Sequence, residues 1–167
     1  MLDRRLLGAT LALVLVAAAC TGGDGSATDD LLPYFEQVEQ ITVDRDETTQ
    51  GLPDTTDIES ARAFFSTGNP AFEIALGELS TLVPPEAAQE PHDRLIELQG
   101  QLLALNRRIA ERLDSIDTAE EFAALASDAE LGVQPQNALG AEVEAACDDL
   151  QAVADSAAID VSLRCDI

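Results

Sequence analysis

The hydrophobic residues of this chain recur with the period of an α-helix along most of its length. The clearest case is residues 91–116, where apolar side chains fall three and four positions apart over about seven helical turns. We expect a helix there that begins as early as Glu86, bends at Pro91 and ends at Asp117. Its apolar face is the longest in the chain, which predicts that this helix is the central and most buried one of a bundle. The face consists of Leu95, Leu98, Leu102, Leu105, Ile109, Leu113 and Ile116.

Two amphipathic helices are expected before the central one. The first covers about residues 29–46, with Pro33 in its first turn, where proline is tolerated. The second covers about residues 57–83 and is interrupted by Gly68-Asn69-Pro70, so it forms either one kinked helix or two collinear pieces. The predicted apolar faces are Leu31, Phe35, Val38 and Ile41 in the first helix, and Ala61, Phe65, Phe72, Leu76, Leu79 and Val83 in the second.

Two helices and an extended tail are expected after the central helix. Thr118 and Glu121 have the Ser/Thr-x-x-Glu spacing of a capping box, which predicts a short helix that ends at Gly132. After a turn around Pro135, the last helix covers about residues 136–157. The tail alternates apolar and polar residues, which predicts an extended conformation. The fold class is therefore all-α: an antiparallel up-down helical bundle of about four main helices plus a short one, with an extended C-terminal tail.

The two C-terminal cysteines lie on apolar faces that the chain can bring together. Cys147 is on the apolar face of the last helix and Cys165 on the apolar side of the tail. The last helix extends roughly 15 Å from Cys147 to the turn that follows it. About seven extended residues after the turn can cover roughly 20 Å, so the tail is long enough to bring Cys165 back to Cys147. The alternatives are a catalytic thiol, which needs a base, and a zinc site with His92, which needs four ligands in a chain with one histidine. We predict a Cys147–Cys165 disulfide.

Charge narrows the range of partners. The 167 residues carry a formal net charge of −23 and are 46% hydrophobic, which fits one soluble globular domain. Such an acidic surface repels phosphate backbones, so DNA and RNA are excluded as partners.

The N-terminus has the organisation of an export signal. Arg4 and Arg5 precede an uncharged apolar run of 14 residues from Leu6 to Ala19, which is too short for a permanent membrane span. The run ends in Ala17-Ala18-Ala19-Cys20 followed by Thr-Gly-Gly, and it resembles the lipobox of bacterial lipoproteins, with alanine at a position where leucine is usual. An ordinary secretory signal cut near Ala19 is the alternative, and export by the general or the twin-arginine route stays open.

The lipobox resemblance implies that Cys20 receives a diacylglyceryl thioether and becomes the mature N-terminus. Residues 1–19 are then a signal peptide, residues 20–28 a lipid-anchored flexible tether and residues 29–167 the helical bundle domain. The protein would sit on the extracytoplasmic face of the cell membrane. The number of cysteines agrees with lipidation. The chain has three, so a lipidated Cys20 leaves Cys147 and Cys165 as a pair in an oxidising compartment.

Candidate sites are few. His92 is the one histidine, and Arg107, Arg108 and Arg112 form the one basic cluster, which suits either an anion or acidic side chains of neighbouring helices. No phosphate-binding loop, nucleophile-elbow or zinc-protease motif is present, and we expect no metal and no cofactor.

The helical body is similar to small uncharacterised lipoproteins of high-GC Gram-positive bacteria, a resemblance that implies no catalytic residues. We expect a non-catalytic module that binds an envelope protein or a small ligand, at the Gly68-Asn69-Pro70 interruption or at the arginine cluster. The alternatives are a hydrolase with a carboxylate-based site near His92 and an anion-binding protein that uses Arg107, Arg108 and Arg112.

Overall fold

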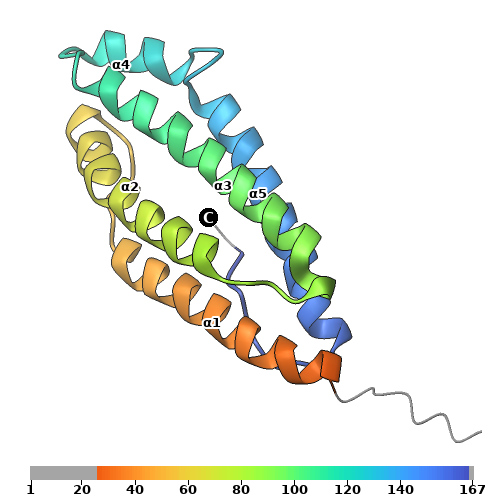
Figure 1. The fold of residues 1–167 in the computed structure, drawn as a ribbon. Helices are drawn as coiled ribbons and strands as arrows, with labels where there is room; N and C mark the ends of the chain where they lie inside the picture. The colour runs from red at the N-terminus through yellow and green to blue at the C-terminus, as the bar shows by residue number, and fades with distance from the viewer. Residues whose placement is uncertain (1–25, 166–167) are drawn as a thin grey trace, which may run out of the picture.

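The four long helices of the protein run antiparallel to one another in chain order, and a short helix lies across one end (Figure 1). The structure, a computed structural model, describes residues 26–165, and the predicted signal peptide and Cys20 lie outside this range. No strand occurs in the described range, so the predicted all-α bundle is confirmed. The helices are α1 (Ser26–Thr49), α2 (Ile58–Thr81), α3 (Glu86–Leu113), α4 (Ala119–Ala126) and α5 (Val133–Ser156).

Helix α1 begins earlier than predicted. It starts at Ser26, inside the segment assigned to the tether, so Pro33 lies well within the helix and not in its first turn.

The connection between α4 and α5 also differs from the prediction. The Thr118–Glu121 capping box is present, but α4 ends at Ala126, and Gly132 is the N-cap residue of α5. The turn predicted around Pro135 is wrong, because Pro135 lies in the first turn of α5, where helices accept proline. Gly132 is required there, since a Cβ atom would collide with the backbone of Ala126 and Asp128.

Helix α2 is continuous through Pro70, which decides between the two predicted forms of this segment. Pro70 is exposed, so the carbonyl that loses its helical partner can bond to water. The predicted face is partly wrong. Val83 is 88% exposed beyond the end of the helix, Phe72 and Leu76 are only partly buried, and Gly68, Ala71 and Ala75 are buried.

Helix α3 is the central helix, as predicted, and packs against both α2 and α5. It contributes buried side chains to both hydrophobic clusters of the core. It ends at Leu113 and not at Asp117, and Arg62 of α2 caps this end. The Arg62 guanidinium donates to the carbonyl of Leu113 at 2.8 Å and to that of Ile116 at 2.7 Å, next to the negative end of the helix dipole.

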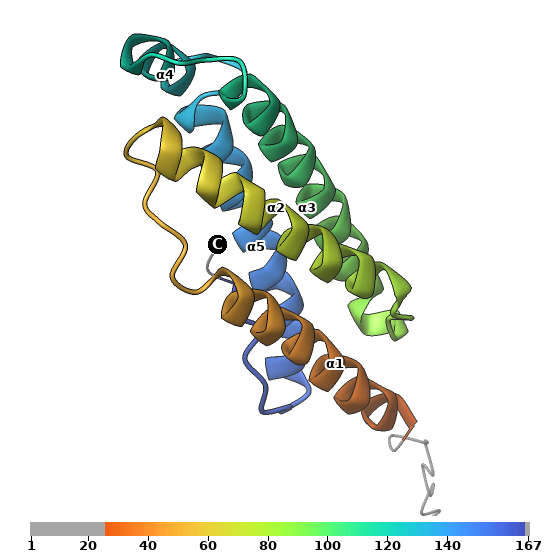
Figure 2. The ribbon, with the colours of Figure 1, turned by 90° about the vertical axis from the view of Figure 1, so that its left-hand side faces the viewer.

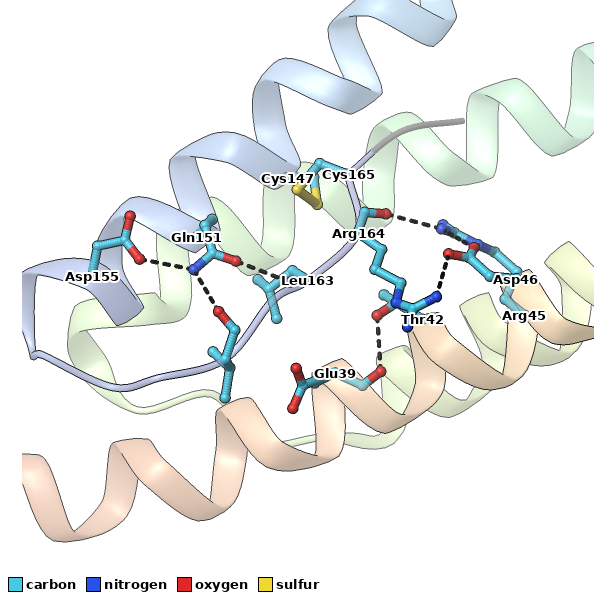
Figure 3. Close-up of a disulfide and its surroundings, with 11 residues drawn as sticks. Glu39, Thr42, Arg45, Asp46, Cys147, Gln151, Asp155, Leu163, Arg164 and Cys165 are labelled. Carbon is cyan, nitrogen blue, oxygen red and sulfur yellow. Dashed lines mark hydrogen bonds and ion pairs between the residues drawn. A yellow bond between two sulfur atoms is a disulfide. The ribbon is translucent and has the colours of Figure 1, made fainter.

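The C-terminal tail completes the bundle by lying between α5 and α1 (Figure 3). Direct contacts between α1 and α5 are few. Ile159 and Leu163 are buried in the larger core cluster, as their alternation with polar residues predicts. On the α5 side, one amide holds the tail: Gln151 donates to the carbonyl of Val161 at 3.1 Å and accepts from the N–H of Leu163 at 2.9 Å.

The tail is bound to α1 by polar contacts of its backbone. The N–H of Ser162 donates to the carboxylate of Glu39 at 2.8 Å. The carbonyl of Arg164 accepts from Arg45, whose guanidinium is buried and paired with Asp46 at 2.6 Å. The predicted disulfide is confirmed: Cys147 and Cys165 are bonded, with 5.4 Å between their Cα atoms.

Removal of this disulfide tests the role of the tail. We expect the Cys147→Ala/Cys165→Ala variant to lose about 3 kcal/mol of unfolding free energy, the chain-entropy value for a loop of this size. Urea unfolding measures the loss, and reductant should destabilise the wild type to the same level without affecting the variant. Equal stability of oxidised and reduced wild-type protein would contradict this role.

Candidate functional site

A cavity of about 610 Å³ lies in the half of the bundle that α1 does not cover. Figures 1 and 2 show α1 displaced along the bundle toward the end opposite α4. The larger core cluster contains α1 residues, whereas the cluster near α4 contains none. The cavity opens between α2, α3 and α5, and α4 and the connection after α1 border it.

One face of α5 forms a wall of the cavity. Its residues fall three and four apart, so they share one side of the helix. The small residues Gly140 and Ala141 leave the cavity open on this side. The face of α5 that packs into the core, which includes Val143, lies beside the cavity face. The cavity face consists of Val133, Gln136, Asn137, Gly140, Ala141 and Glu144.

The opposite wall is apolar and aromatic. Four of the five phenylalanines of the chain line the cavity. Three come from α2 and one from α4, and the α3 side adds a row of aliphatic residues at helical spacing. These side chains are Phe64, Phe65, Phe72 and Phe122, with Leu102, Ile109 and Leu113 of α3.

A pair of amide side chains, one buried and one half-buried, provides the polar contact inside the cavity. Asn106 of α3 is 5% exposed, and its Oδ1 accepts a hydrogen bond from Nε2 of Gln136 at 3.1 Å. In the part of the chain that the structure describes, the Nδ2 group of Asn106 donates to no protein atom. It is thus one hydrogen-bond donor for a bound molecule.

The connection between α1 and α2 forms the rim of the cavity. Gly51, with φ at +84°, adopts the left-handed conformation that lets the chain turn after α1. Leu52 then lies against α2, where a Cβ atom at Gly68 would be 3.6 Å from its Cδ1. Asp54 follows at the exposed edge.

The predicted arginine cluster is largely neutralised by acidic side chains. Arg107 pairs with Glu73 of α2 at 2.6 Å, and Arg108 pairs with Glu130 at 3.6 Å. Arg112 donates to the hydroxyl of Ser115 at 2.9 Å. None of the three lines the cavity. These contacts favour pairing of Arg107 and Arg108 with acidic side chains of neighbouring segments and weigh against an anion site there.

His92 lies outside the cavity and is buried between α1 and α3. Its Nδ1 forms a hydrogen bond with the hydroxyl of Tyr34 at 2.8 Å. Burial lowers the pKa of His92, although the charge of Asp93 acts in the opposite direction. Burial, and then the charge of Asp93, raises the pKa of Tyr34. The imidazole ring of His92 is therefore neutral at pH 7, and its burial gives it a packing role. The hydrolase with a carboxylate-based site near His92 stays a prediction.

The cavity was not predicted from the sequence, and the Gly68-Asn69-Pro70 interruption, where a ligand was expected, does not line it. Phe65 and Phe72, which flank the interruption, both line the cavity. The missed signal was the run of small and amide residues at helical spacing on α5, beside the apolar stripe of the same helix.

Metal-ligating clusters and membrane-spanning helices are two further features that indicate function in a protein. No cluster of three metal-ligating side chains occurs among residues 26–165, and none of the helices described there has the length and apolarity needed to cross a membrane. Comparisons with protein-family models, curated proteins and solved structures give no match to this chain.

Buried His92 makes stability depend on pH in a specific way. The pKa of His92 is lower in the folded protein than in the unfolded chain. Its neutral ring therefore contributes to the unfolding free energy above about pH 6.5, and this contribution is lost as the pH falls. The matched variant is His92→Gln, which keeps an acceptor for Tyr34 but does not titrate. We expect the unfolding free energy of the wild type to fall relative to that of the variant between pH 7.5 and 5.5. A difference that is constant over this range would contradict the prediction.

Proposed function

We propose that this protein is a lipid-anchored, extracytoplasmic helical module that binds a small molecule with an apolar body in the cavity between α2, α3 and α5. The single observation that carries the proposal is the cavity itself. Its volume of about 610 Å³ falls inside the range of roughly 300–1,000 Å³ that small-molecule sites occupy.

The chemistry of the lining supports binding and not covalent catalysis. Phenylalanine and aliphatic side chains provide an apolar surface, and Asn106 and Gln136 provide a few polar contacts that can orient a ligand. The residues that line the cavity include no His, Cys, Lys or Ser, so no nucleophile–base pair of the usual kind converges there.

The lipid anchor is supported by the sequence and by the disulfide. Ala17-Ala18-Ala19-Cys20 resembles a lipobox, and the Cys147–Cys165 bond belongs in an oxidising compartment outside the cytoplasm. The anchor would hold the cavity close to the membrane surface, where apolar molecules enter and leave the envelope.

Filling the cavity tests the binding proposal. The assay uses residues 20–167 with Cys20→Ser, a chain that contains every described residue, and the neutral fluorescent dye N-phenyl-1-naphthylamine. We expect the dye to bind this chain and to lose at least tenfold in affinity in Gly140→Leu, because the new side chain occupies the cavity. No protein atom lies within 4 Å of a Cβ at Gly140, so the fold should tolerate the change.

Gly77→Leu is the matched control. Gly77 is also helical with no atom within 4 Å of an added Cβ, but it is exposed on α2 and does not line the cavity. Dye binding should be unchanged in this variant, and circular dichroism should show native helicity in both. Failure of the dye to bind, or equal binding to Gly140→Leu, would refute the proposed site.

Replacement of Cys20 tests the anchor separately. We expect the full-length wild-type protein to sediment with membranes and to partition into detergent, because a diacylglyceryl group is inserted in the bilayer. Cys20→Ala should abolish both properties, whereas Cys147→Ala, which removes a cysteine but not the lipid site, should retain them. A wild-type protein found wholly in the soluble exported fraction would contradict the anchor.

A further inference from the structure

The cavity carries a charge preference that identifies the class of its ligand. We propose that it binds cationic amphiphiles: molecules with an alkyl or similarly apolar body and an ammonium or other cationic head. This inference rests on the proposed function, since it names the ligand of the same cavity.

The rim of the cavity is acidic. Two carboxylates, Asp54 at the connection after α1 and Glu144 on α5, are exposed residues among those that line it. Neither pairs with an arginine within the described range. Their charges are therefore available to a cationic head group.

No positive side chain lines the cavity, and the nearby arginines are already engaged. Arg45 is buried and paired with Asp46, Arg62 caps the carbonyl end of α3, and Arg108 pairs with Glu130. A carboxylate or phosphate head would find no partner among these residues. With a net charge of −23 on the chain, the field of the whole protein also opposes an anion.

The aromatic wall adds a second, independent preference for cations. The faces of phenylalanine rings carry partial negative charge, and ammonium groups bind over them within about 6 Å. The protein already uses this interaction once, because the Arg45 guanidinium lies 5.8 Å from the centre of the Phe72 ring. Phe64, Phe65 and Phe122 offer further rings in the same cavity.

A series of ligands that differ only in the head group tests the charge preference. Decyltrimethylammonium, 1-decanol and decanoate, each below its micellar concentration, displace the neutral dye from the Cys20→Ser chain at pH 7.5. We expect the ammonium compound to bind on the order of tenfold more tightly than decanoate, with decanol between them. Added salt should reduce the advantage of the cation and leave decanol unaffected.

Two variants locate the charge effect. Glu144→Gln should weaken decyltrimethylammonium binding roughly two- to fivefold, the effect of one exposed charge pair, and leave decanol unchanged. Glu142→Gln is the matched control, because Glu142 is an exposed carboxylate of the same helix that does not line the cavity. Gly140→Leu, or Ala141→Leu if the first variant fails to fold, should remove binding of all three compounds.

The outcomes separate this inference from the proposed function. If the dye and decanol bind but decanoate equals or exceeds the ammonium compound, the cavity is a site for another class and the inference is wrong. Cation binding that survives Gly140→Leu would mean attraction to the acidic surface alone, which also overturns it. If no compound binds, or if the chain forms a dimer that excludes the dye, the proposed function fails as well.

Discussion

The packing of this bundle depends on the C-terminal tail, because α1 and α5 make few direct contacts with each other. A helix with one apolar stripe must bury that stripe against another element. Leu163, which is 1% exposed, fills the space that a closer approach of the two helices would otherwise fill. The disulfide fixes where the tail lies along α5, and hydrogen bonds to Gln151, Glu39 and Arg45 fix it between the two helices. The fourth wall of the bundle is thus shared between a helix and an extended segment.

The displacement of α1 along the bundle accounts for the cavity. At the end that α1 covers, the core is continuous, and Phe35 and Leu150 are fully buried. At the other end three helices surround a space that a fourth helix would occupy, and the small residues of the α5 face do not fill it. The cavity is open to solvent at its rim, so its apolar walls stay in contact with water unless another molecule covers them.

The sequence predicted the parts of the structure that follow from local patterns. Helical spacing identified α3 and α5, and the Thr118–Glu121 capping box identified α4, because each signal lies within one or two turns. The cavity, the Arg62 cap of α3 and the Tyr34–His92 hydrogen bond join residues far apart in the chain. They depend on how far each helix is shifted along its neighbour, and no local pattern specifies that shift. The exposure of Val83 has a different, local cause: α2 ends at Thr81, and a residue that precedes a proline avoids the helical conformation.

Arg45 connects the tail to the cavity. It is buried on α1, binds the carbonyl of Arg164 in the tail and lies over the ring of Phe72, which lines the cavity. Its charge is balanced by Asp46, so it can hold the tail without presenting a free positive charge to a ligand. The same ion pair therefore has two effects: it anchors the segment that closes the bundle, and it engages the guanidinium that lies beside Phe72. The exposed carboxylates at the rim and the aromatic wall are the two features on which the proposed preference for cations rests.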